Sequence, residues 1–239
     1  RGLLLWRSMI QWFGGMGIIM LGMMLLSRVM GGGMALARAE LTGTSLSRLR
    51  PKIKQTALAL WGLYVVLTIV EFLMLKFVGK MSYFDAVNHA LTTLPTGGFS
   101  TYDASIGHFD SVAVELIIIF FMFLAGVNFT LLWMFRDGQF KKALRDEELR
   151  YYVFYILIAL VIVFIALLLS GDYNGPDALR DSLFQVVSIA TSTGYGSADY
   201  IPWPVATHVV IFMLMIIGAS AGSTGGGLKL MRVTLAFKV

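Results

Sequence analysis

Five long apolar stretches constrain the fold of this chain more than any other feature. They cover residues 8–27, 57–75, 112–135, 151–170 and 205–228, and each holds at most one charged residue. A helix that crosses a bilayer needs about 20 mostly apolar residues. Only 14% of the 239 residues are charged, whereas a soluble domain carries about 25%. We therefore predict an all-α membrane protein.

Two shorter segments, 83–94 and 178–191, are too short to cross a bilayer, and we expect them to be re-entrant helices. Ser82 and Asp85 form an S-x-x-D pattern typical of a helix start, and Asn174 can cap the second segment. The C-terminal end of a helix carries roughly half a negative charge. Both helices therefore direct negative potential at the segments that follow them.

Those following segments, 95–101 and 192–197, are rich in Gly and Thr. Glycine permits the positive φ values of a tight loop, and a ring of backbone carbonyls can replace the water shell of a cation. The candidate cation-binding residues are Thr96, Gly97, Gly98, Phe99, Ser192, Thr193, Gly194 and Tyr195. Close helix packing in lipid is the alternative role for such residues. We favour the filter because non-helical backbone at membrane depth must line a cavity or be buried in protein.

An internal repeat of 96 residues relates the two halves of this pattern. The shift superimposes Gly194-Tyr195 on Gly98-Phe99, Asp181 on Asp85, Asp199 on Asp103, Ala221-Gly222 on Ala125-Gly126, and Arg232 on Arg136. Matches in one register indicate a duplicated unit. We predict repeated helix–pore-helix–helix units, like those of potassium channels.

The charges predict sidedness. Most of the 19 Lys and Arg residues lie in 28–54, 136–150 and the tail from 229 onward, which places these segments on the cytoplasmic side. Aspartates, among them Asp103 and Asp199, lie on the other side. They can form an outer mouth that concentrates cations, although each can also be an ordinary solvated loop charge. This distribution accounts for the net charge of +5, and we expect no nucleic-acid partner.

The last apolar stretch is interrupted by a glycine-rich segment, 218–227. Each of its three consecutive glycines costs about 1 kcal/mol relative to alanine inside a helix, so we predict a broken helix. A kink made for packing is the alternative. The segment is not a phosphate-binding loop, because Leu228 separates Gly227 from Lys229 and Leu230 stands where Ser or Thr is needed.

Three motifs resemble one family. They are Thr96-Gly97-Gly98-Phe99-Ser100-Thr101, Trp12-Phe13-Gly14-Gly15-Met16-Gly17-Ile18-Ile19 and Ala221-Gly222-Ser223-Thr224-Gly225-Gly226-Gly227-Leu228-Lys229. Together they are similar to the Trk/Ktr/HKT superfamily of potassium transporters, and most similar to its TrkH-type members. Two departures from the family pattern are Tyr195 in place of Phe, and Gly196-Ser197 in place of a Thr pair.

The resemblance implies four repeats around one pore, of which this chain would hold part. It divides the chain into the last helix of repeat one (1–30), a cytoplasmic loop (31–56), repeat two (57–136), a second cytoplasmic loop (137–150) and repeat three (151–239). Repeat two has a helix at 57–78, a pore helix at 83–94, a filter at 95–101 and a helix at 111–135. Repeat three has a helix at 151–170, a pore helix at 178–191, a filter at 192–197 and a broken helix at 204–235. Because the chain also lacks an initiator Met, we expect a fragment of a longer protein.

The resemblance also implies a function: potassium transport across the cell (inner) membrane, gated by the glycine-rich loop. The gate residues are Gly218, Ser220, Gly222, Ser223, Thr224, Gly225, Gly226, Gly227 and Lys229. The implied partners are K⁺ as substrate, the lipid bilayer, a second copy in a homodimer, and a cytosolic nucleotide-binding regulatory subunit of the TrkA/KtrA type. No cofactor is expected. Without Cys and with three scattered His, we expect neither a transition-metal site nor an enzyme.

Two alternatives stay open. One is a sodium-permeable or sodium-coupled member of the same superfamily. The other is a secondary solute carrier with broken helices, which predicts inverted repeats and paired membrane carboxylates. The repeat here has one orientation, and Glu71 stands alone in its span. We expect Glu71 to snorkel or to pair with another helix, and Asn128 to hydrogen-bond between helices.

Overall fold

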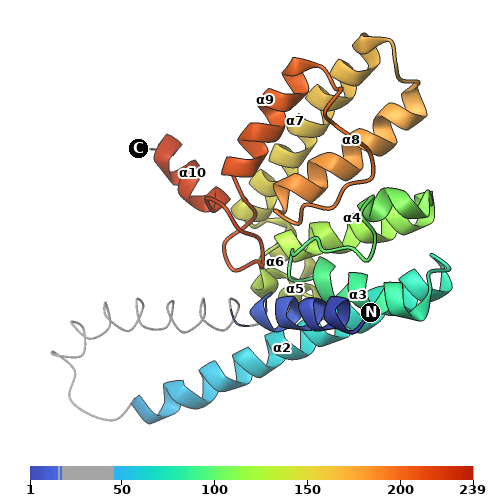
Figure 1. The fold of residues 1–239 in the computed structure, drawn as a ribbon. Coiled ribbons are helices and arrows are strands. Elements are labelled where there is room, and N and C mark those ends of the chain that lie inside the picture. Colours follow the sequence, from blue (N-terminus) through green and yellow to red (C-terminus); the bar gives the residue numbers. More distant parts are fainter. Residues whose placement is uncertain (16, 18–45, 239) are drawn as a thin grey trace.

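The computed structural model describes residues 1–15, 17 and 46–238. This part of the chain is helical and contains no strands, which confirms the predicted fold class (Figure 1). After an N-terminal helix (residues 2–15) come α2 (Leu46–Phe77), α3 (Tyr83–Thr93), the 3-10 helix η1 (Ser105–Phe109), α4 (Val112–Gly126), α5 (Phe129–Arg136), α6 (Phe140–Leu144), α7 (Glu147–Ser170), α8 (Gly175–Ala190), α9 (Val205–Ile216) and α10 (Leu230–Lys238).

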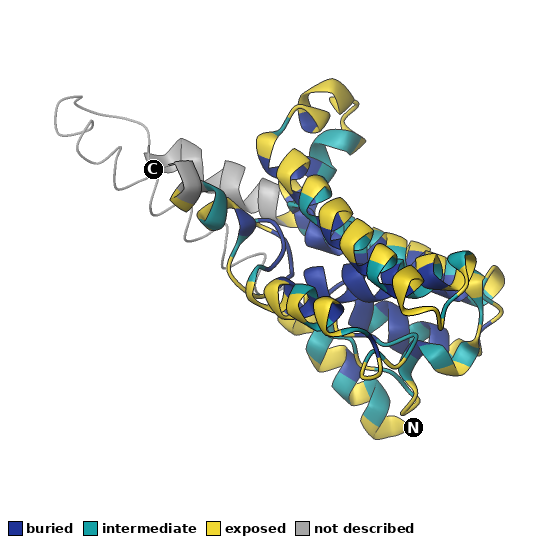
Figure 2. Ribbon diagram, turned by 90° about the horizontal axis from the view of Figure 1, so that it is seen from above, coloured by how far each residue is buried: buried dark blue, intermediate teal, exposed yellow. Residues whose placement is uncertain are grey.

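The helices form two groups that meet at α4. The N-terminal helix, α2 and α3 form one group, and α7, α8 and α9 form the other, with α4 between them (Figure 1). Buried residues gather where the helices face one another, and exposed residues follow their outer sides (Figure 2). Large apolar residues are exposed on α7, including Phe154, Val161 and Ile165. An apolar outer face suits contact with lipid rather than with water.

The short helices begin where the sequence provides caps. Ser82 accepts a hydrogen bond from the backbone N–H of Asp85 at the start of α3. Asn174 accepts one from Asp177 at the start of α8, with Pro176 in the first turn. Asp146 caps α7 by accepting from Leu149 N–H. Each cap satisfies backbone donors that have no partner inside the helix.

Two described helices, Leu58–Phe77 within α2 and Glu147–Ser170, are long and apolar enough to cross a membrane. A third span is possible by length if α4 and α5 are taken together, but they are bent by 106°. α9 is apolar and has only 12 residues. The expected span at 8–27 and the expected loop at 31–56 extend into residues outside the described part.

The bend between α4 and α5 differs from the single helix expected at 111–135, and it has a local cause. Val127 is extended, with φ −80° and ψ 149°. The side chain of Asn128 then caps α5 by accepting from Thr130 N–H at 2.9 Å. Asn128 was expected to hydrogen-bond between helices; its side chain starts α5 and also lies within hydrogen-bonding reach of Glu148 on α7. The bend frees carbonyls at the end of α4, which the glycine-rich loop uses.

Candidate functional site

The segments after the two pore helices make the same backbone turn. The N–H groups of Gly97 and Gly98 both donate to the Thr92 carbonyl, at 2.8 and 3.2 Å. The N–H groups of Thr193 and Gly194 both donate to the Ser188 carbonyl, at 2.9 and 3.2 Å. Each donor and each acceptor of the second turn lies 96 residues after its counterpart in the first turn. The sequence repeat is therefore also a repeat of backbone conformation.

The φ angles repeat with the same spacing. They are 56° at Thr96 and 64° at Gly98 in the first segment, and 57° at Ser192 and 83° at Gly194 in the second. A left-handed conformation costs a non-glycine residue roughly 1–2 kcal/mol. Two such residues at equivalent positions point to a conformation maintained for function. Gly97 and Thr193, which lie between these residues, do not have positive φ, and such alternation lets successive carbonyls face the same side of the chain.

Hydroxyl groups on the pore helices hold the outer ends of these turns. Thr92 Oγ1 donates to the Phe99 carbonyl at 2.9 Å, and Ser188 Oγ donates to the Tyr195 carbonyl at 2.7 Å. We did not single out Thr92 or Ser188 from the sequence. The signal was available, because the 96-residue shift superimposes one small hydroxyl residue on the other.

The structure brings the two turns together. A side chain added at Gly98 would overlap the carbonyl oxygen of Thr193, and its Cβ would lie 3.1 Å from the carbonyl carbon of Gly194. Farther along, the N–H groups of Ile106 and Gly107 donate to the Gly196 carbonyl at 3.0 and 3.1 Å. The predicted filter residues of the two repeats thus form one cluster instead of lying on separate faces of the bundle.

The aromatic residues of the two segments have different surroundings. Tyr195 is fully buried, and its hydroxyl lies 2.7 Å from Thr92 Oγ1 in the other repeat. Phe99 is 40% exposed, and the Arg7 guanidinium lies 4.5 Å from its ring centroid. Arg7 also donates to the Ser100 carbonyl at 2.7 Å. The N-terminal helix therefore supports the first segment by a contact that the sequence did not suggest.

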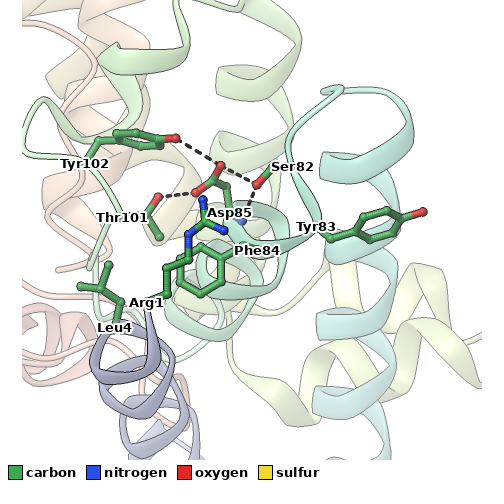
Figure 3. A pocket seen from close by; sticks show the side chains of 8 residues that line it. All are labelled: Arg1, Leu4, Ser82, Tyr83, Phe84, Asp85, Thr101 and Tyr102. Atoms are coloured by element: carbon green, nitrogen blue, oxygen red, sulfur yellow. Dashed lines mark hydrogen bonds between the residues drawn. The ribbon is translucent and has the colours of Figure 1, made fainter.

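Asp85 ties the start of α3 to the last residue of the first filter segment, Thr101, and to the next residue, Tyr102 (Figure 3). Its carboxylate accepts from Ser82 Oγ and Thr101 Oγ1, both at 2.7 Å, and from the Tyr102 hydroxyl at 3.4 Å. Asp85 is 6% exposed. A buried carboxylate with several donors is a rigid anchor, so Asp85 positions the outer end of the filter segment.

The predicted outer-mouth residues, Asp103 and Asp199, are both exposed and follow the two filter segments. Asp199 accepts from Ile201 N–H at 2.9 Å.

Arg180 of α8 forms ion pairs with two other carboxylates. It binds Glu115 at 2.7 Å and Asp110 at 3.2 Å. These hydrogen bonds, chiefly the one to Glu115, raise the pKa of the Arg180 guanidinium. This cluster joins the second pore helix to α4.

The predicted gate residues all lie in the non-helical segment between α9 and α10. At its neck, Gly218 N–H donates to the Leu228 carbonyl at 2.9 Å, and a side chain at Gly218 would overlap the Gly226 carbonyl. Within it, Ser223 Oγ donates to the Ser220 carbonyl at 2.6 Å. This glycine-rich loop is therefore closed tightly on itself.

The broken end of α4 binds this loop. Ser220 N–H donates to the Gly126 carbonyl at 3.1 Å, and Thr224 N–H donates to the Ala125 carbonyl at 3.3 Å. Thr224 Oγ1 also donates to the carbonyl of Leu94, at the end of α3, at 2.8 Å. The bend in the α4–α5 pair thus supplies acceptors that an unbroken helix would use internally.

Both filter turns contact the glycine-rich loop through equivalent residues. Thr96 Oγ1 donates to the Thr224 carbonyl at 3.1 Å, and Ser192 Oγ accepts from Gly226 N–H at 2.6 Å. Thr96 and Ser192 are the two left-handed non-glycine residues described above. A displacement of the loop would therefore change the contacts of both turns at once.

Glu71 of α2 lies in the interior, at the first pore helix. It is fully buried and close to Thr93 and Tyr195. A fully buried side chain does not snorkel to the membrane surface. The structure thus excludes the snorkelling that the sequence left open. It places Glu71 next to Thr93 of the first pore helix.

Comparison with known proteins identifies the family. The model of the TrkH family, described as cation transport protein, matches residues 1–239. The chain belongs to the TrkH family. It is 40% identical over 240 residues to the Trk system potassium uptake protein TrkH of Halomonas elongata, covering all of this chain and 50% of that protein. It is 41% identical over 241 residues to the TrkH protein of Escherichia coli strain K12, again covering all of this chain and 50% of the other.

A solved structure gives the same result. The crystal structure of the potassium transporter TrkH from Vibrio parahaemolyticus matches with a TM-score of 0.84 and 37% identity, over 98% of this chain and 48% of that one. The chain thus spans about half the length of the TrkH-family relatives it matches. The family is one of membrane-embedded cation transporters and not of enzymes.

Proposed function

We propose that this chain is part of the ion-translocating subunit of a Trk-type potassium uptake system, and that 95–101 and 192–197 are two of its filter segments. One observation carries the proposal: two segments 96 residues apart adopt the same turn, with the same hydrogen bonds, and meet at Gly98 and Thr193. The names of the relatives, Trk system potassium uptake proteins, support potassium as the ion.

Selection in this proposal depends on backbone oxygens. The carbonyls of Thr96, Gly97 and Gly98, with those of Ser192, Thr193 and Gly194, replace part of the water shell of K⁺. The C-terminal ends of α3 and α8 lie next to these residues and add negative potential. The exposed Asp103 and Asp199 raise the local concentration of cations.

The glycine-rich loop is the proposed gate. It binds both filter turns through Thr96 and Ser192, so its observed position is linked to the filter. We infer that ions pass when the loop moves away from these turns. The complete transporter would lie in the inner membrane as a homodimer. A cytosolic nucleotide-binding regulatory subunit would contact the basic residues of 136–150.

An uptake experiment tests the proposal. The complete transporter that contains this segment is expressed in bacteria lacking potassium uptake, and rubidium uptake and growth at low potassium are measured. We expect rescue of growth, with weak inhibition of rubidium uptake by sodium. A variant lacking residues 220–226 should show greater uptake. Failure to rescue growth despite normal expression would contradict the proposal, and equal uptake of sodium would favour the sodium-permeable alternative.

A further inference from the structure

A carboxylate from α7 binds the backbone of the glycine-rich loop. Glu148 accepts a hydrogen bond from Ala221 N–H, one residue before Gly222, which has a φ of 71°. Glu148 is only 9% exposed. Hydrogen bonds to an ionised acceptor are about twice as strong as those between neutral groups. The bond from Ala221 N–H to Glu148 is therefore stronger than the loop's bonds to the carbonyls of α4.

Other polar groups surround the same carboxylate. The side chains of Asn128 and Lys229 lie close enough to interact with it, and so does Asp146, a neighbour on its own helix. Lys229 in turn donates from Nζ to the Gly225 carbonyl. Two opposite charges thus hold the loop, Glu148 near its beginning and Lys229 near its end. A buried carboxylate is costly unless it keeps its donors, so this arrangement favours the observed loop position.

The place of Glu148 in the chain connects the loop to the cytoplasmic side. Glu148 is in the first turn of α7, directly after the cap Asp146. The preceding segment, from Asp137 through α6, is rich in basic residues. Glu148 therefore lies within one helical turn of that segment and binds Ala221 of the loop.

We propose that Glu148 is a positioning residue that keeps the glycine-rich loop against the two filter turns and transmits movements of the 137–146 segment to the loop. The proposal rests on the gate role proposed above. It assigns the coupling to one carboxylate and one backbone N–H. Loss of the carboxylate should therefore release the loop and its contacts with Thr96 and Ser192, while the backbone hydrogen bonds within each filter turn stay in place.

A labelling experiment tests this directly and does not depend on ion flux. In a cysteine-free version of the complete transporter, Ser223→Cys places a thiol on the loop at a residue that is 2% exposed. Glu148→Ala should raise the rate of its modification by a thiol reagent by about tenfold, as expected for loss of a charge-assisted hydrogen bond. Glu148→Asp, which keeps a carboxylate, should stay near the parent rate, and Glu148→Gln should lie between the two.

Ion uptake is the second measurement. Glu148→Ala should raise rubidium uptake while leaving discrimination against sodium unchanged, which a folding defect would not do. Glu147→Gln, at an exposed position beside Glu148 on α7, is the matched control and should leave both readouts unchanged. If Glu148→Ala fails to fold, the labelling rate and the rubidium uptake of Glu148→Gln test the positioning role instead. Parent-like labelling in the variants would overturn the positioning role, whereas absence of uptake in the parent would overturn the proposed function alone.

Discussion

Repeats two and three build the same filter turn on different supports. In repeat two, Asp85 binds Thr101 at the end of the filter segment, and Arg7 binds Ser100. In repeat three, Arg180 of the pore helix α8 binds Glu115 and so anchors that helix to α4. The turn itself depends on bonds that both repeats share, from backbone N–H groups and from Thr92 or Ser188. The two repeats therefore share the turn and differ in the contacts that support it.

The two repeats also differ in how tightly the filter glycine is enclosed. A Cβ at Gly98 would overlap the Thr193 carbonyl, whereas a Cβ at Gly194 meets no described atom within 4 Å. Both glycines have positive φ. Substitution at either position therefore strains the backbone, but only substitution at Gly98 also displaces a carbonyl of the other repeat.

The largest effect is expected at this pair. Gly98→Ser should lower selectivity for potassium over sodium more than tenfold, because the left-handed backbone costs roughly 1–2 kcal/mol and overpacking adds about 1–3 kcal/mol. Gly194→Ser should cause a smaller loss, from the backbone alone. Competitive uptake of rubidium and sodium measures both. Equal losses would contradict the difference in enclosure, and unchanged selectivity in both would contradict the filter assignment.

The next effect concerns the aspartates related by the repeat. Asp85→Asn should lower the free energy of unfolding by about 1–2 kcal/mol, because hydrogen bonds to a charged acceptor are lost. Asp181 is half-buried, and burial raises the pKa of its carboxyl. The stability that Asp181 contributes is thus present at low pH and is lost as pH rises through this raised pKa.

Asp181→Asn should therefore be neutral or slightly stabilising at neutral pH. Thermal unfolding of the detergent-solubilised transporter measures both variants. A larger loss for Asp181→Asn than for Asp85→Asn would show that the supports of the two repeats have been assigned the wrong way round.

Much of this architecture follows from the sequence, because apolar length and glycine position act locally. The pore helix at 83–94 and the break at 218–227 correspond to α3 and to the loop between α9 and α10. The bend after Gly126 was not predicted, although Asn128 caps α5 locally, because the carbonyls that it frees accept from Ser220 and Thr224, which are distant in sequence. Glu148 was missed for the same reason. Its role comes from a contact with Ala221, 73 residues away.

A smaller effect is expected for the pore-helix hydroxyls. Thr92 Oγ1 reaches both the Phe99 carbonyl and the Tyr195 hydroxyl, whereas Ser188 Oγ reaches the Tyr195 carbonyl. Thr92→Val should lower potassium selectivity by about fivefold and Ser188→Ala by about threefold, since a neutral hydrogen bond contributes roughly 0.5–1.5 kcal/mol. The competition between rubidium and sodium uptake measures both losses. A larger loss for Ser188→Ala than for Thr92→Val would show that the filter turn of repeat three depends more on its hydroxyl.

The smallest effect is expected for Tyr195→Phe, which removes only the hydroxyl between the repeats. We expect a loss of about 0.5–1 kcal/mol in unfolding free energy and little change in selectivity, because the Tyr195 carbonyl keeps its bond from Ser188. Phe99→Tyr, at the exposed equivalent, is the control. A large selectivity change in Tyr195→Phe would mean that ion selectivity depends on the contact between the Tyr195 hydroxyl and Thr92, and not on the backbone turn.

The most direct test of the filter is to locate the ion. Crystals of the complete transporter grown with rubidium should show an anomalous peak within coordination distance of the carbonyls of residues 96–98 and 192–194. A peak elsewhere, with none between Gly98 and Gly194, would contradict the claim that these two turns form one cation site.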